Sequence, residues 1–138
     1  MREINRIVVH HTATPTNTSV DSIRDYHMNN LGWRDIGYHY IIEVNGHLRL
    51  GRPDWMIGAH VKGKNSDSIG VAVIGNYQDI NFLWQGRWST RQARTLHVVL
   101  TDLRQRYPDV DIVTHRELAN TLCPGKNVQA WIDKWRGL

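Results

Sequence analysis

Short apolar runs alternate along the chain with longer stretches in which apolar side chains recur every three or four residues. The short runs are typical of strands and cover residues 7–10, 38–44, 47–50, 69–74 and 110–114. The Asn45-Gly46 pair between the second and third runs is typical of a hairpin turn. The periodic stretches predict helices at about residues 20–27, from Ser89 to about Pro108, and at 128–135.

The order of these segments predicts the fold class. Strands alternate with helices and one hairpin interrupts them, which predicts an α/β fold with a central mixed β-sheet flanked by helices. Polar, glycine-bearing stretches at about residues 58–68 and 76–86 are expected to be loops. The 138 residues are 41% apolar and 22% charged. They contain no repeat or linker, so we expect a single domain over residues 1–138.

Charge and hydropathy narrow the range of partners. The net charge is +4 and the pI is about 9.5, which favours a polyanionic partner such as nucleic acid, an anionic lipid surface or an acidic cell-wall polymer. The basic residues are scattered, with no run of five, so we do not expect nucleic-acid binding. No apolar run approaches the roughly 18 residues that span a bilayer, so stable membrane insertion is not expected either. The N-terminal residues lack the pattern of a secretory signal, which predicts a cytoplasmic protein unless another route releases it.

The candidate chemistry lies at the ends of two predicted strands. His10 ends the first strand, His115 follows the last one, and Cys123, the only cysteine, lies eight positions after His115. Two imidazoles and one thiolate are three good zinc ligands, and a fourth position left for water is typical of a catalytic site. The chain has no CxxC pair and no HExxH helix. Spacing alone therefore does not distinguish a zinc site from its alternative, a buried structural cysteine with two incidental histidines.

Strand alternation distinguishes the two adjacent histidines. Neighbouring residues of a strand point to opposite faces, so only one of His10 and His11 is expected to reach the site. His10 shares a face with Val8, whereas His11 shares one with Ile7 and Val9. We favour His10 as the ligand.

Several motifs together resemble a known family. They are the run 7–13 (IVVHHTA), the run 32–42 (GWRDIGYHYII), Gly58-Ala59-His60, the run 65–77 (NSDSIGVAVIGNY), and His115-Arg116-Glu117 followed by Cys123-Pro124-Gly125. In this order they resemble the type 2 N-acetylmuramoyl-L-alanine amidases, a superfamily that also contains the peptidoglycan recognition proteins and small phage amidases. The resemblance runs from about Ile7 to Gly125. It implies a mixed sheet with packed helices and cleavage of the amide between N-acetylmuramic acid and L-alanine.

The resemblance also implies roles for individual residues. It places the three ligands of one zinc ion per chain on His10, His115 and Cys123, and the catalytic tyrosine on Tyr38. Thr121 stands where many phage enzymes carry lysine and where recognition proteins often carry threonine. A hydroxyl there can still donate a hydrogen bond, so Thr121 is a second candidate catalytic residue.

The expected function is a zinc-dependent amidase that acts on peptidoglycan or muropeptides. Such a chain suits a monomeric phage or prophage endolysin that is made in the host cytoplasm and reaches the cell wall through a holin-type pore. A cytoplasmic muropeptide-recycling amidase is one alternative, although that branch carries aspartate where this chain has Cys123. A recognition module that binds peptidoglycan without cutting it is the other, although three intact ligands and Tyr38 weigh against it.

Other histidines and the tryptophans have simpler expected roles. We expect structural or solvated positions for His27, His39, His47 and His97. His60 is left open between lining a glycan groove and fixing its loop. At least one of Trp131 and Trp135 is expected in the core, and groove or surface contacts are expected for Trp55, Trp84 and Trp88. Lys62, Lys64 and Arg52 are expected on a solvated loop rather than against stem-peptide carboxylates.

Overall fold

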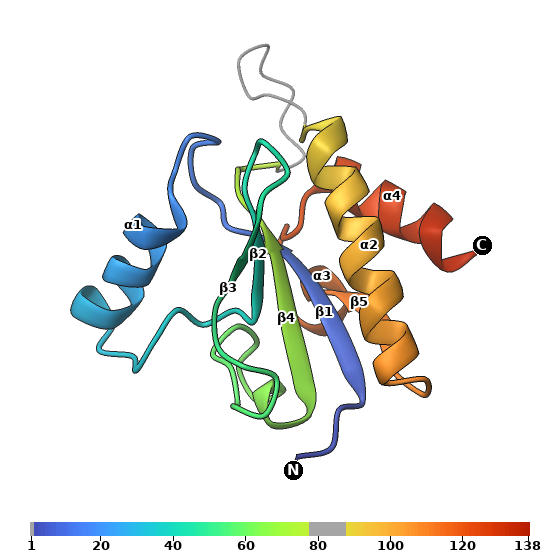
Figure 1. The fold of residues 1–138 in the computed structure, drawn as a ribbon, viewed down its shortest axis with the longest axis horizontal. Coiled ribbons are helices and arrows are strands. Elements are labelled where there is room, and N and C mark those ends of the chain that lie inside the picture. The colour runs from blue at the N-terminus through green and yellow to red at the C-terminus, as the bar shows by residue number, and fades with distance from the viewer. Residues whose placement is uncertain (1, 78–87) are drawn as a thin grey trace.

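A five-stranded sheet is the central layer of the protein in the computed structural model, which describes residues 2–77 and 88–138 (Figure 1). The strands are β1 (Arg6–His11), β2 (Tyr40–Ile42), β3 (Leu48–Leu50), β4 (Ser68–Val73) and β5 (Asp111–Thr114). Their order is β3-β2-β4-β1-β5. Every neighbouring pair is parallel except the β2–β3 hairpin, which is antiparallel. The predicted mixed sheet is confirmed.

Helices cover both faces of this sheet. They are α1 (Val20–Asp25), continued by the π-helical turn η1 (Tyr26–Asn30), and α2 (Thr90–Arg106), α3 (His115–Leu118) and α4 (Lys126–Arg136); η2 (Asn65–Asp67) is a 3-10 turn. Figure 1 shows α2 and α4 on one side of the sheet and α1 on the other. A capping box between Ser89 and Gln92 explains why α2 begins where the sequence predicts.

The alternation of the strands decides which side chains enter each layer. Ile7 and Val9 pack with α2 and α4 in the larger core cluster, which also holds Leu100 and Ile132. The other face carries a smaller cluster in which Ile23 of α1 meets Ile41. His10 pairs in register with Ala72, and Ala72 with Ile41, so the His10 side chain lies on the α1 face.

Two details differ from the sequence prediction, and a third prediction lies mostly outside the described residues. The strand predicted over 38–44 is shorter, because Tyr38 and His39 precede β2, although Arg52 and Gly51 still donate backbone hydrogen bonds to their carbonyls. The short helix α3 was not predicted; a capping box between Thr114 and Glu117 supports it. Most of the loop predicted at 76–86, with Trp84, lies outside the described residues. Over residues 2–77 and 88–138, no helix is long and apolar enough to cross a membrane.

Candidate metal centre and its pocket

The sheet register brings the two candidate histidines together. Thr114, the last residue of β5, pairs with Val9 of β1, so the residues that follow this pair, His115 and His10, are also neighbours. Their ring centroids are 4.7 Å apart. Because β1 and β5 are parallel, both histidines lie at the carboxyl ends of neighbouring strands, where catalytic groups of open α/β sheets gather.

Cys123 reaches the same place from the loop between α3 and α4. Its Sγ lies 3.7 Å from His10 Nδ1, and the backbone N–H of His11 donates to it at 3.3 Å. Gly125 allows the chain to leave this loop, because its φ of +90° lies in the left-handed region. A Cβ at Gly125 would overlap the backbone carbonyl of Tyr77.

This group of donors fits a tetrahedral metal ion. The ligand atoms of His10, His115 and Cys123 all lie within 4.8 Å of one another. Zinc–nitrogen and zinc–sulfur bonds of about 2.0 and 2.3 Å at a tetrahedral angle place the two ligand atoms about 3.5 Å apart, close to the Cys123–His10 distance of 3.7 Å. The residue types and their spacing therefore suit zinc.

Burial sets the protonation of these donors. It lowers the pKa of His10 well below its ordinary value, with help from His60 and His115, and it also lowers the pKa of His115. Both imidazoles therefore keep a free lone pair at neutral pH. Burial raises the pKa of Cys123 to about 12, although the His11 N–H and Arg116 oppose this. A bound cation is the partner that a thiolate at this position needs.

His11 lies outside the metal group, as strand alternation predicts. Its Nδ1 accepts the backbone N–H of Tyr77 at 3.0 Å on the side of the larger core cluster. His10 is the member of the pair that joins His115 and Cys123.

The two candidate catalytic residues occupy different positions. The ring of Tyr38 lies 5.3 Å from that of His10. Burial raises the pKa of Tyr38 far above its usual value, and a charged Cys123 would raise it further, so the phenol stays protonated and can donate. The Thr121 hydroxyl accepts the backbone N–H of Cys123 at 3.3 Å, a contact that supports the ligand loop.

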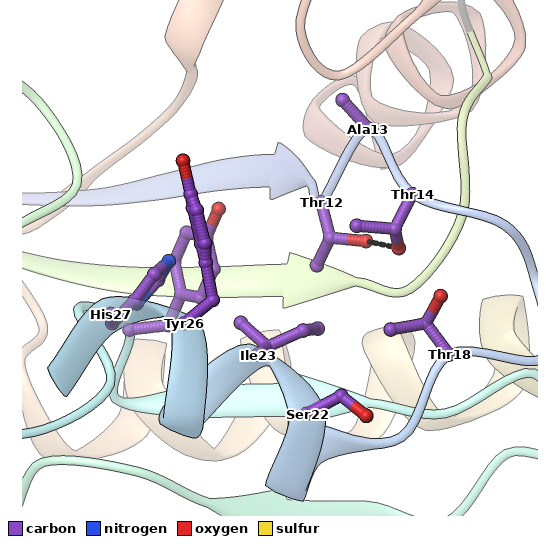
Figure 2. Close-up of a pocket in the computed structure, with 9 residues that line it drawn as sticks. Thr12, Ala13, Thr14, Thr18, Ser22, Ile23, Tyr26 and His27 are labelled. Carbon is purple, nitrogen blue, oxygen red and sulfur yellow. Dashed lines mark hydrogen bonds between the residues drawn. The ribbon is translucent and has the colours of Figure 1, made fainter. Parts of the chain in front are cut away.

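An open pocket of about 470 Å³ lies next to Tyr38, between α1 and the segment after β1 (Figure 2). Many of its side chains carry hydroxyl groups, and Thr12 and Thr14 are hydrogen-bonded to each other at 2.7 Å. The lining residues are Thr12, Ala13, Thr14, Thr18, Ser22, Ile23, Tyr26, His27 and Tyr38. The sequence analysis did not predict this pocket, although residues 12–18 hold four threonines, of which Thr12, Thr14 and Thr18 line it.

The remaining histidines are mostly structural, as predicted. His27 Nδ1 accepts the backbone N–H of Gly37 at 3.0 Å. His39 Nδ1 accepts the N–H of Gly70 at 3.0 Å, and its Nε2 lies 2.7 Å from the Met56 carbonyl. His47 and His97 are exposed on the hairpin and on α2.

His60 makes a contact that the sequence did not reveal. Its Nδ1 lies 2.8 Å from Nε2 of His10, and it is not among the residues that line the pocket. Burial, followed by the charges of His39 and His115, lowers the pKa of His60 to about 3, so the ring is neutral.

Two other expectations need correction. Arg52 is buried rather than solvated, because its guanidinium donates to the carbonyls of Ile36, Ile57 and Asp35. Trp88 packs against the larger core cluster with its ring 5.4 Å from that of Trp131, so it is not a groove residue. Trp135 is 4% exposed and lies in the core, as predicted, and Trp55 is 67% exposed.

Fold and site together define a class: a mixed-sheet α/β domain with a His-His-Cys group at the carboxyl ends of its strands, beside a hydroxyl-lined pocket. Comparison with known proteins gives the family. The chain belongs to the N-acetylmuramoyl-L-alanine amidase family, whose profile matches residues 1–126.

Individual relatives agree with this assignment. The chain is 36% identical over 133 residues to an endolysin of Enterobacteria phage K11, covering 95% of this chain and 87% of the relative. It is 35% identical to peptidoglycan-recognition protein SC2 of Drosophila melanogaster, covering 93% and 72%. The solved structure of N-acetylmuramoyl-L-alanine amidase LysC from Clostridium intestinale URNW is similar with a TM-score of 0.85 and 29% identity, covering 98% of this chain and 87% of that one.

Proposed function

We propose that this protein is a zinc-dependent N-acetylmuramoyl-L-alanine amidase that cuts peptidoglycan as a phage or prophage endolysin. The observation that carries the proposal is the convergence of His10, His115 and Cys123, within 4.8 Å of one another, beside Tyr38 and an open pocket. The family assignment and the similarity to a phage endolysin support the same reaction and the same role. Release to the cell wall through a holin-type pore is part of this proposed role.

In this function, His10, His115 and Cys123 would hold the metal, and a set of three protein ligands leaves a fourth position for water. A bound zinc ion supplies Lewis acidity and brings the pKa of water towards about 7. Cys123 is then occupied as a ligand, so the chain needs no covalent intermediate on its thiol.

Tyr38 acts next to this group as a hydrogen-bond donor. Its phenol stays protonated because burial raises its pKa, and its ring lies against that of His10. In the proposed reaction it donates a hydrogen bond to the negative charge that develops on the carbonyl oxygen of the cleaved amide. Loss of one such donor typically lowers the rate by about 10²–10³-fold.

The pocket binds the substrate beside the reacting amide. Its threonine and serine hydroxyls donate to and accept from amide and sugar groups, and Tyr26 offers an aromatic surface. The stem peptide and the N-acetylmuramic acid present both kinds of polar group. In this proposal, the pocket orients the substrate through these polar groups.

Digestion of purified sacculi tests the proposal. The protein with zinc should release stem peptides that begin with free L-alanine, identified by mass. A chelator should stop the release and added zinc should restore it, and His10→Ala, if folded by circular dichroism, should release none. A wild-type protein that binds sacculi and zinc but releases no peptide would instead be a recognition module, and the amidase proposal would fail.

A further inference from the structure

The two ring nitrogens of His10 face different partners. Nδ1 lies 3.7 Å from Cys123 Sγ, on the side of the metal group. Nε2 lies 2.8 Å from Nδ1 of His60. In a neutral imidazole one nitrogen carries the proton and the other offers a lone pair, so the partner of Nε2 decides whether Nδ1 is free to bind a metal.

A chain of hydrogen bonds runs away from this contact and ends on a backbone carbonyl. His60 Nε2 lies 3.2 Å from Ser68 Oγ, and Ser68 Oγ donates to the carbonyl of Lys64 at 2.8 Å. A carbonyl oxygen can only accept, so the single hydroxyl proton of Ser68 is committed to it. Ser68 must then accept from His60.

The direction of the whole chain follows from this fixed end. If His60 Nε2 donates to Ser68, the neutral ring has no proton on Nδ1, which can only accept. His10 must therefore donate through Nε2, which leaves the lone pair of its Nδ1 pointing towards Cys123 and His115. The tautomer that the metal needs is selected without reference to the metal itself.

The surroundings of His60 hold its ring in place. The backbone N–H groups of His60 and Val61 both donate to Oδ1 of Asn65 at 2.9 Å, which fixes the loop. Gly70 of β4 lies against the ring, and a Cβ there would come within 2.7 Å of His60 Cγ. The ring is thus seated between a braced loop and a strand that has no side chain at this point.

We propose that His60, supported by Ser68, is a positioning residue that fixes the tautomer and orientation of His10 for metal binding. The inference rests on the proposed zinc site but concerns residues that do not touch the metal. Partners of this kind typically contribute 10–100-fold in metal affinity.

A matched pair of substitutions tests the proposal through zinc affinity, measured by competition with a chromophoric chelator. His60→Leu fills much of the space but removes the acceptor, and zinc affinity should fall about 10–100-fold. His60→Asn places its Oδ1 near the position of the imidazole Nδ1, so affinity should stay within about threefold of wild type. Equal zinc affinity for wild type and His60→Leu would overturn the inference, as would equal losses for the two variants. If wild type itself binds no zinc, the proposed function fails first.

The tautomers give a second test that needs neither a variant nor activity. In the metal-free protein labelled with ¹⁵N-histidine, long-range ¹H–¹⁵N spectra should show His60 protonated on Nε2 and bare on Nδ1. His10 should likewise carry its proton on Nε2. A His60 ring protonated on Nδ1 would refute the chain direction, even if the His60 variants failed to fold.

Discussion

Replacing His11 and His10 by alanine, one at a time, should show that His11 supports the fold and that His10 binds the metal. His11 is 4% exposed, and its Nδ1 accepts the backbone N–H of Tyr77 at 3.0 Å. His10 instead faces His115 and Cys123. We therefore expect His11→Ala to lose stability but keep zinc, and folded His10→Ala to lose zinc and activity.

The size of the stability loss follows from these contacts. Alanine removes the acceptor of a buried N–H, which costs about 1–3 kcal/mol. It also leaves a cavity where the ring was, so the free energy of unfolding should fall by roughly 2–4 kcal/mol. With an unfolding entropy of about 2.1 cal/mol/K per residue, 1 kcal/mol corresponds to about 3–4 °C in a chain of this length, which predicts a fall in Tm of about 7–14 °C.

Thermal unfolding of the metal-free proteins, followed by circular dichroism, measures this loss, and chelator competition measures zinc binding. His11→Asn is the matched control, since its Oδ1 lies near the place of Nδ1 and keeps an acceptor for Tyr77, so its Tm should fall much less. A His11→Ala protein as stable as wild type would refute the reasoning about the buried hydrogen bond. Zinc lost from folded His11→Ala but kept by folded His10→Ala would show that the wrong face of β1 was chosen.

Four further changes test the rest of the site. Cys123→Ser should weaken zinc binding strongly in a competition titration, because a hydroxyl is a far poorer ligand than a thiolate; full zinc content would contradict the site. Tyr38→Phe should lower kcat by about 10²-fold or more with KM and zinc unchanged, and an unaltered kcat would remove Tyr38 from the chemistry. Thr121→Lys should leave activity on sacculi equal or higher if added positive charge stabilises the oxyanion, whereas lower activity would assign a specific role to the hydroxyl. Burial alone would raise the pKa of Glu117, but hydrogen bonds from Arg136 and the Thr114 N–H lower it. Its stabilising effect is therefore present above about pH 4.3 and lost as the pH falls through the lowered pKa. Glu117→Gln should lower Tm at pH 7 but not near pH 2, and an equal loss at both would refute the ion pairing.

Local patterns in the sequence were sufficient for the sheet and for the faces on which His10 and His11 lie. β-branched runs, the Asn45-Gly46 turn and the Ser89 cap are signals that act over a few residues, and β1, the hairpin and α2 lie where they predict. Strand alternation is equally local, and it places His10 and His11 on opposite faces. The short helix α3 escaped prediction because four residues are too few for a periodic pattern.

Only the tertiary structure decided which distant groups meet. The hydrogen bond between His10 and His60 joins residues 50 positions apart in the sequence. The pocket lined by threonines forms because α1 packs beside the segment after β1. Arg52 and Trp88 were misjudged for the same reason, since their partners lie on other elements. The sequence determined the elements and the types of the candidate ligands, because these depend on side-chain chemistry and on spacing along one strand or helix. The packing of the elements determined which nitrogen of His10 faces Cys123, because the two partners of its ring, Cys123 and His60, come from separate segments.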